Sequence, residues 1–333
     1  MTQTLDEFSA LLLFLAMGVY AISFIAFTLD LGRRSAGAEV VAESGAQRIA
    51  RARAIAGGAS GSAGSPYRPV TTLERPREEP PVRTRESLAL RVGVTLAVLG
   101  WVLHLGATVL RGIAAARVPW ANMYEFSMTG TLLILGVFLL LLVRRDLRFL
   151  GAIITGLVVL MLGVTTVGFR VDVAPLPPAL QSAWLVIHVL VAILATAFFT
   201  VGAALSIVQL VKAGRDGSAE SRLRFAAAIP GATTLETWAY RVNIVGFIFW
   251  TFTLIAGAIW AEAAWGRYWG WDTKEVWTFI IWTIYAGYIH ARATRGWRGS
   301  RSAWLAIVGY AAVLFNFGIV NVFFKGLHAY SGL

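Results

Sequence analysis

The sequence predicts an all-α integral membrane protein with about eight transmembrane helices, and three observations support this fold class. Of the 333 residues, 57% are hydrophobic and only 14% are charged, whereas soluble domains carry about 25% charged residues. Several apolar runs reach the length of about 20 residues that spans a bilayer as a helix. Basic residues gather in the short segments between these runs, which is typical of the loops that orient a membrane protein.

The first apolar run, at 8–30, is too long for a signal-peptide core and has no basic segment before it, so a mature helix is expected. Seven further runs are the remaining expected helices: 88–110, 123–143, 148–167, 183–211, 241–262, 275–291 and 302–324. The chain therefore divides into a first transmembrane helix at 1–30, a linker at 31–86 and a membrane domain of seven helices at 88–333.

The linker at 31–86 is Arg-rich and then rich in Gly, Ser and Pro. Such a composition is typical of disordered segments, because it offers too little apolar area to offset the entropy lost on ordering. A disordered linker is therefore expected. Its side of the membrane follows from the basic connections, which all lie on one side when the turns are counted: 31–86, 144–148, 212–224 and 290–301.

By the positive-inside rule, the side with these basic connections is the cytoplasm. Both termini and the loop that begins at Trp265 are then expected on the external face. The net charge of +11 is explained by the same loops, so membrane lipid rather than nucleic acid is the expected surrounding. The chain contains no Cys, which excludes disulfides, thiolate metal sites and Cys nucleophiles within it.

The segment "WGRYWGWDTKEVW" at 265–277 combines four indoles with charged residues, among them Asp272, Lys274 and Glu275. A single Trp at a membrane boundary usually belongs to the aromatic belt, but a belt does not explain this spacing. Trp265 and Trp269 are four residues apart and would share a face of a helix. Trp271 and Asp272 follow another Gly, and Asp272 is a candidate N-cap for the next helix.

Four histidines are present, and two of them are expected on the face of the Trp-rich loop. His188 lies at the outer end of the fifth predicted helix, and His328 follows the last one. Imidazole is a common metal ligand and a usual axial ligand of haem iron, and the indoles could wall a flat porphyrin. The alternative, that each His is a surface or capping residue, stays open at this point.

The other two histidines are expected at different depths. His290 lies 18 residues after Asp272, about 27 Å along a helix, so it cannot reach the iron that His188 and His328 would hold. His104 lies within the second predicted helix, where an ionisable residue is a functional candidate or a neutral His bonded to a neighbouring helix. The depths of His104 and His290 match poorly.

The octapeptide "WGRYWGWD" fits the pattern W-G-x-x-W-x-W-D of the haem-handling WWD proteins of cytochrome c maturation. The segments "TKEVWTFIIWTIYAGYIHAR", "HLGATVLRGIAAARVPWANMYEF" and "NFGIVNVFFKGLHAY" extend the resemblance. Residues 88–333 thus resemble the CcsA family, also called ResC and in some bacteria CcsB. It is the membrane half of the system II haem lyase.

The resemblance implies that haem b is bound as the substrate, with His188 and His328 as ligands of an external haem iron. It implies that His290 is a ligand of an inner haem iron, and that its counterpart is either His104 or a His of the partner chain. The residues that it implies as the cradle of the external haem are Trp265, Gly266, Trp269, Trp271 and Asp272.

The resemblance also implies a membrane subunit of a cytochrome c haem lyase in the bacterial cytoplasmic membrane, with its site on the external side. The implied partners are a ResB-like membrane chain, apocytochrome c and thiol-reducing proteins that act on the apocytochrome. The reacting thiols belong to the C-x-x-C-H segment of the apocytochrome, so no catalytic residue is assigned within this chain. The alternatives are a CcmC-like haem delivery protein, a transporter of a non-haem substrate and a structural scaffold.

Overall fold

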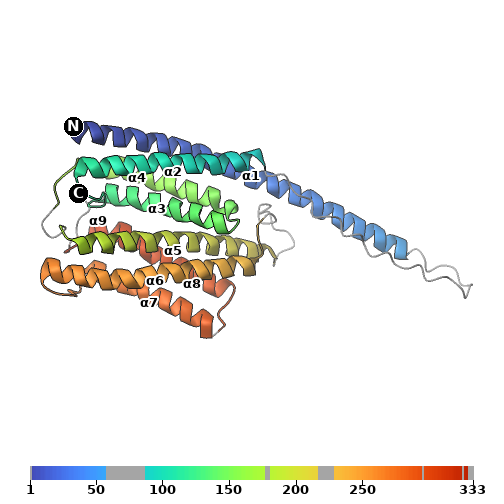
Figure 1. The fold of residues 1–333 in the computed structure, drawn as a ribbon. Helices are drawn as coiled ribbons and strands as arrows, with labels where there is room; N and C mark the ends of the chain where they lie inside the picture. Colours follow the sequence, from blue (N-terminus) through green and yellow to red (C-terminus); the bar gives the residue numbers. More distant parts are fainter. Residues whose placement is uncertain are drawn as a thin grey trace, which may run out of the picture.

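The computed structural model describes residues 2–57, 87–176, 181–216, 229–294, 296–324 and 326–328, with side chains of the first helix described as far as Arg34 and those of the fifth as far as Gly214. Throughout these ranges the regular structure is helical, so the predicted all-α class is confirmed. The long helices run side by side as a bundle (Figure 1). They are α1 (Thr2–Gly57), α2 (Leu88–Ala115), α3 (Met123–Arg144), α4 (Gly151–Gly168), α5 (Ala183–Asp216), α6 (Ala232–Trp265), α7 (Thr273–Thr294) and α8 (Ser300–Phe315).

Short helical pieces complete the bundle. A 3₁₀ turn, Arg148–Leu150, precedes α4, and a π-helical segment, Asn316–Val320, continues α8 into the short α9 (Asn321–Phe323). A π-helical segment inside a longer helix is often found at a functional site. Asn316, the first residue of this segment, lines a large cavity of the bundle.

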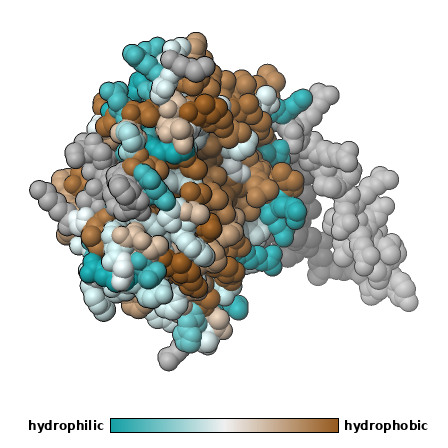
Figure 2. Space-filling view, turned by 60° about the vertical axis from the view of Figure 1, so that its left-hand side comes forward, coloured by the Kyte–Doolittle hydropathy of each residue, from teal (hydrophilic) through white to brown (hydrophobic). Residues whose placement is uncertain are grey.

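Seven of the helices are long and apolar enough to cross a membrane, and α7 is the exception. Its 22 residues could span the hydrocarbon layer, but its first turn holds Lys274 and Glu275 and its last turns hold His290 and Arg292. Figure 2 shows a band of apolar side chains between hydrophilic ones at the two ends of the molecule. The chain is thus an integral membrane protein, as its composition predicts.

The bundle has two halves that meet at α5. In one half, α1 packs against α2 and α4, and α3 packs against α4 and α5, around a core that includes Tyr20, Leu135 and Phe138. In the other half, α5, α6, α7 and α8 enclose a core that includes Phe199 and Tyr285. Because α5 contributes to both cores, it fixes the position of each half relative to the other.

The first helix is much longer than the sequence predicts. The backbone of α1 remains helical as far as Gly57, where a disordered linker is expected from residue 31, and this extension leaves the bundle in Figure 1. The reason is local composition, since the segment before Gly57 is rich in Ala and Arg and also contains Glu, all of which are strong helix formers. The Gly-, Ser- and Pro-rich remainder at 58–86 lies outside the described residues.

α6 also begins earlier than predicted, at Ala232 instead of 241. The charged Glu236 lowers the hydropathy of this part of the sequence, so the apolar run is recognised only after it. In the structure Glu236 is buried and accepts hydrogen bonds from the Arg292 side chain and the Gly299 backbone N–H, at 3.1 and 3.0 Å. This carboxylate joins the ends of α6, α7 and α8.

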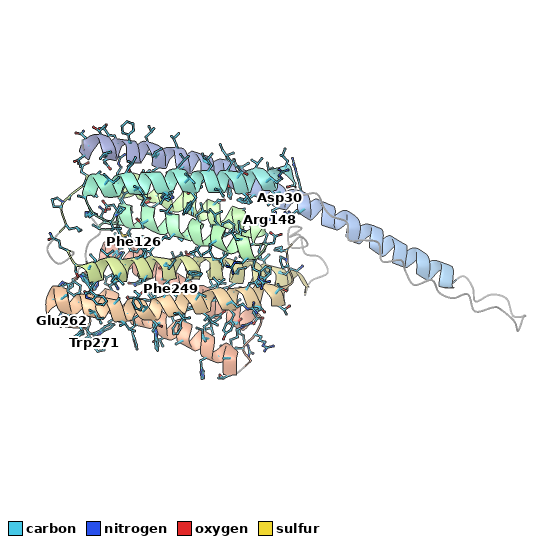
Figure 3. The ribbon with its side chains drawn as sticks, viewed as in Figure 1. Asp30, Phe126, Arg148, Phe249, Glu262 and Trp271 are labelled. Atoms are coloured by element: carbon cyan, nitrogen blue, oxygen red, sulfur yellow. The ribbon has the colours of Figure 1, made fainter. Side chains whose placement is uncertain are left out.

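The two ends of the bundle differ in what they carry. The start of α1, the loop between α6 and α7, and α9 lie at one end, where Glu262 and Trp271 are labelled in Figure 3. Asp30 and Arg148 lie at the opposite end, with the C-terminal end of α7. The assignment of the first end to the external face remains a prediction.

Candidate functional site

The loop between α6 and α7 is shaped by signals at both of its ends. α6 ends at Trp265 because Gly266 adopts a left-handed conformation, φ 68°, and its N–H bonds to the Glu262 carbonyl. At the start of α7, Asp272 accepts a hydrogen bond from the backbone N–H of Lys274 at 3.4 Å, as the predicted N-cap does. Glu275 reaches back to the N–H of Asp272 at 3.1 Å, which completes a capping box.

The indoles of the loop therefore do not lie as the spacing predicts. Because the helix ends at Trp265, Trp265 and Trp269 do not share a helical face, and that prediction is wrong. Trp269 lines a small cavity, whereas Trp271 is 78% exposed and its backbone is left-handed, with φ 57°. The two rings meet edge to face with their centroids 6.0 Å apart, so the exposed Trp271 contacts a residue that lines the cavity.

His328 is positioned by the carboxylate that caps α7. Its Nδ1 lies 2.8 Å from Oδ2 of Asp272, and the backbone N–H of Leu327 donates to Oδ1 of the same side chain at 3.2 Å. Gly326 permits this approach, because a Cβ at that position would lie 2.1 Å from Oδ1 of Asp272. One carboxylate thus joins the start of α7 to the segment that follows the last helix.

His188 is positioned by α6. Its Nδ1 lies 3.0 Å from the Thr253 carbonyl oxygen, which fixes the ring against the helix. Gly257 provides the space, because a Cβ there would lie only 2.7 Å from Cε1 of His188. The ring also stacks on Trp260, with the centroids 5.9 Å apart and the planes 16° from parallel.

Trp260 joins the two histidines, and sequence reasoning missed it. The indole is buried, and its centroid lies 5.6 Å from that of His328 as well as against His188. Trp265 also contacts His328, with centroids 4.9 Å apart. The structure therefore brings His188, His328 and the Trp cluster together as predicted. No spacing along the chain signals Trp260, because the two histidines that it contacts belong to other segments.

Two cavities adjoin the histidine pair, and both His188 and His328 line both of them. The larger has an empty volume of about 1350 Å³, part of it open to the surroundings, and is lined by residues of α3, α5, α6, α7 and α8. Its walls are mainly apolar, including Phe126, Trp250 and Phe317. The smaller, of about 450 Å³, adds Trp269 from the loop. An apolar cavity with a few convergent polar groups is typical of a ligand site.

The two histidines of the site could complete the coordination of a metal ion whose other ligands come from a bound molecule. Each histidine has Nδ1 beside an oxygen acceptor, so the tautomer with its proton on Nδ1 leaves Nε2 free for a metal. Burial lowers the pKa of His328, which keeps the ring neutral, and the hydrogen bond from that ring lowers the pKa of the Asp272 carboxyl. No group of three His, Cys, Asp or Glu side chains in the described ranges could hold a bare ion. Two imidazoles suffice for an iron in a porphyrin.

A buried ion-pair network supports the same end of the bundle. Glu125 of α3 accepts hydrogen bonds from Arg111 of α2 at 3.0 Å and from Arg117 at 2.5 Å. Arg111 also pairs with Asp6 of α1 at 2.5 Å and donates to the Val171 carbonyl at 2.9 Å. The side chains of Arg111 and Glu125 are fully buried. The network fixes the start of α3, whose Met123 lines the larger cavity.

The structure separates the remaining histidines from this site and from each other. His290 is exposed near the end of α7, and the unbroken helix puts it about 27 Å from Asp272. His104 is buried in α2, with Nδ1 3.3 Å from the Tyr20 hydroxyl. Since α2 packs against α1, α3 and α4 while α7 packs against α6 and α8, the arrangement does not support an iron shared by His104 and His290.

Comparison with known proteins identifies the family. A profile of the family described as "Cytochrome C assembly protein" matches residues 120–328. A Guillardia theta protein, "Cytochrome c biogenesis protein CcsA", is 36% identical over 240 residues, which cover 67% of this chain and 80% of the relative. The chain belongs to the cytochrome c assembly family, in its CcsA branch. Its general role is therefore cytochrome c biogenesis.

Further similarities agree with this assignment. The CcsA protein of Synechococcus sp. (strain CC9605) is 40% identical over 178 residues, which cover 47% of this chain and 58% of the relative. The solved structure "Cytochrome c Heme Lyase CcmF" matches with a TM-score of 0.61 at 16% identity, covering 98% of this chain and 50% of that chain. At that identity the CcmF similarity shows a shared fold. The range matched by the family profile contains His188, the Trp-rich loop and His328, but not His104.

Proposed function

We propose that the chain holds haem b at the external face of the membrane and presents it to apocytochrome c, as the membrane subunit of a haem lyase. The observation that carries this proposal is the pair His188 and His328 beside Trp260. Each ring has Nδ1 next to an oxygen acceptor, and within the described part of the chain neither Nε2 makes a hydrogen bond. Two such imidazoles suit the two axial positions of a haem iron.

The surroundings of the pair suit a porphyrin. The indoles of Trp260 and Trp265 lie within 6 Å of the imidazoles, centroid to centroid, and the adjoining cavities are large and mainly apolar. Trp269 adds a further wall in the smaller cavity, and Asp272 acts by positioning His328. Gly266 turns the chain at the end of α6, and Trp271 lies at the exposed edge of the loop.

The orientation in the membrane follows from charge. Arg148 and the C-terminal end of α7, which carries Arg292, lie at the end of the bundle opposite the Trp-rich loop (Figures 1 and 3), and the positive-inside rule makes that end cytoplasmic. The loop, His188 and His328 then face the outside, as do both termini. The match to a Synechococcus protein is consistent with a bacterial cytoplasmic membrane as the location.

The chemistry is an addition that consumes neither oxidant nor reductant. Each thiol of a C-x-x-C-H segment adds across a haem vinyl group: sulfur bonds to the carbon next to the ring, and the thiol hydrogen goes to the terminal carbon. The His of that segment then replaces one resident imidazole at the iron. A ResB-like membrane chain assists, and separate thiol-reducing proteins keep the apocytochrome reduced. His290 binds a second haem near the cytoplasmic face and serves delivery.

The test is haem binding and cytochrome c maturation by His188→Ala and His328→Ala. Each variant should lose the bis-His absorbance of the outer site and abolish maturation, and added imidazole should partly restore both where the cavity stays open. Trp304→Ala is the matched control, because Trp304 is an exposed aromatic residue on α8 away from the cavities. Normal maturation by either His variant at normal protein level would contradict the proposal.

His290→Ala tests delivery separately. It should lower the haem content of the outer site without changing that site's affinity, so external haem should refill it. The same addition should fail in the His188→Ala, His328→Ala double variant. An outer site of the His290 variant that stays empty at saturating haem would refute the two-site arrangement.

A further inference from the structure

Lys274 occupies a central place in the site for which the proposed function gives no role. It is the second residue of α7 and lines both cavities that adjoin the histidine pair. The residue is only partly exposed, because its surroundings are the cavity walls. A cation therefore faces the same enclosed space as His188 and His328.

The ammonium group of Lys274 makes one side-chain hydrogen bond, and its partner is uncharged. It donates a hydrogen bond to the side-chain carbonyl of Asn321, and no carboxylate of the described residues lies within ion-pair distance of it. The two nearest acidic side chains in the sequence are engaged elsewhere. Asp272 accepts from His328 and Leu327, and Glu275 accepts from the backbone at Gly270 and Asp272.

An ammonium group has three donors, and a charge removed from bulk water is costly unless it is paired. The single hydrogen bond to the side-chain amide oxygen of Asn321 uses one of these donors and does not neutralise the charge. A ligand that brings an anionic group to Lys274 would meet it. The charge of Lys274 therefore favours an anionic ligand in this cavity.

Two further polar atoms of the larger cavity lack partners. Ser127 of α3 and Asn316 of the π-helical segment are buried, and the Ser127 hydroxyl and the Asn316 carbonyl oxygen make no hydrogen bond within the described part of the chain. Both residues line the cavity with Lys274. Asn316 is close to the lysine, because its amide donates to Thr278 at 3.4 Å and Thr278 lies one turn after Lys274.

We propose that Lys274 binds a carboxylate of the haem and thereby sets which edge of the porphyrin points inward. This inference rests on the proposed function. Haem b is apolar apart from two propionates on one edge, which matches an apolar cavity that contains one cation and two unpartnered polar groups. Lys274 is thus a specificity-determining residue, and Ser127 and Asn316 give the carboxylates or their bound water further partners.

The orientation has a consequence for the reaction. The vinyl groups of haem b lie on the half of the ring away from the propionates. With the propionate edge at Lys274, the vinyl-bearing half of the ring is turned away from this lysine. The thiols of an apocytochrome would then have to reach the ring from the side opposite Lys274.

The test compares iron protoporphyrin IX with its dimethyl ester, in which both carboxylates are blocked. Each is titrated into the purified chain in detergent and followed by bis-His absorbance. The wild-type protein should bind the free acid at least tenfold more tightly, the size of effect that a charge-assisted hydrogen bond supplies. Lys274→Met should bind both porphyrins alike while keeping the bis-His spectrum.

Three variants complete the experiment. Lys274→Gln repeats the loss of charge with a polar side chain should Lys274→Met not accumulate, and Lys274→Arg should retain the preference for the free acid. Lys212→Met, the same change at the far end of α5, should leave the preference intact. Equal binding of the two porphyrins by the wild-type protein, or an undiminished preference in both neutral variants, would overturn the role of Lys274. The absence of any bis-His band from the wild-type protein would instead overturn the proposed function.

Discussion

The substitution Gly257→Ala, which adds one methyl group, tests whether His188 needs the space beside Gly257 to bind haem. In Gly257→Ala the new Cβ would lie 2.7 Å from Cε1 and 2.9 Å from Nδ1 of His188, whereas ordinary contacts begin at 3.4 Å. The ring must therefore withdraw by about 0.7 Å. The hydrogen bond from Nδ1 to the Thr253 carbonyl, now 3.0 Å long, would lengthen with it.

Functional groups must be held within about 0.5 Å of their working geometry, so this displacement is large enough to weaken an axial ligand. We expect the haem affinity of Gly257→Ala to fall by about 10- to 100-fold, the range seen when the support of a metal ligand is removed. The bound haem should lose six-coordinate bis-His character, and added imidazole should restore it. The assay is a haem titration followed by absorbance.

Gly287→Ala is the matched control. It makes the same substitution within the helix α7, but a Cβ there meets nothing within 4 Å, so affinity and spectrum should remain those of the wild-type protein. Overpacking costs about 1–3 kcal/mol of stability, so both variants are compared at equal amounts of folded protein. Wild-type affinity with an unchanged bis-His spectrum in Gly257→Ala would refute the assignment of His188 as a ligand held against α6.

Two further predictions concern carboxylates that hold other side chains in place. Asp272→Asn should weaken haem binding by about 10- to 100-fold, because the amide cannot hold the His328 ring and its proton as a carboxylate does; unchanged affinity in the same titration would contradict this role. Glu125→Gln should destabilise the fold by about 1–3 kcal/mol, because Arg111 keeps Asp6 as a partner but loses its second carboxylate, and Arg117 loses its charged partner in α3. Thermal unfolding in detergent measures the effect, with Asp146→Asn at the exposed Arg148 pair as the control. A loss of stability no larger than that of the control would show that the network is not required.

Much of the architecture follows from the sequence because the signals are local. The length of an apolar run determines whether a helix can cross the bilayer, and counting the runs places His188, His328 and the Trp-rich loop at one end. The capping role of Asp272 is also local, since it depends on the first turn of α7. Before Gly57 the prediction of a disordered linker was wrong, because the high helix propensity of Ala, Glu and Arg extends α1 into that segment.

The tertiary structure alone decided how the site is assembled. Trp260 lies between His188 and His328 because α5, α6 and the segment after α9 pack together, and no spacing along the chain reveals that contact. The hydrogen bond between Asp272 and His328 joins residues 56 positions apart. Lys274 lacks a carboxylate partner among the described residues because Asp272 and Glu275 accept hydrogen bonds from other groups. A sequence records which groups are present, whereas the folding of distant segments onto one another determines which of them remain free to bind.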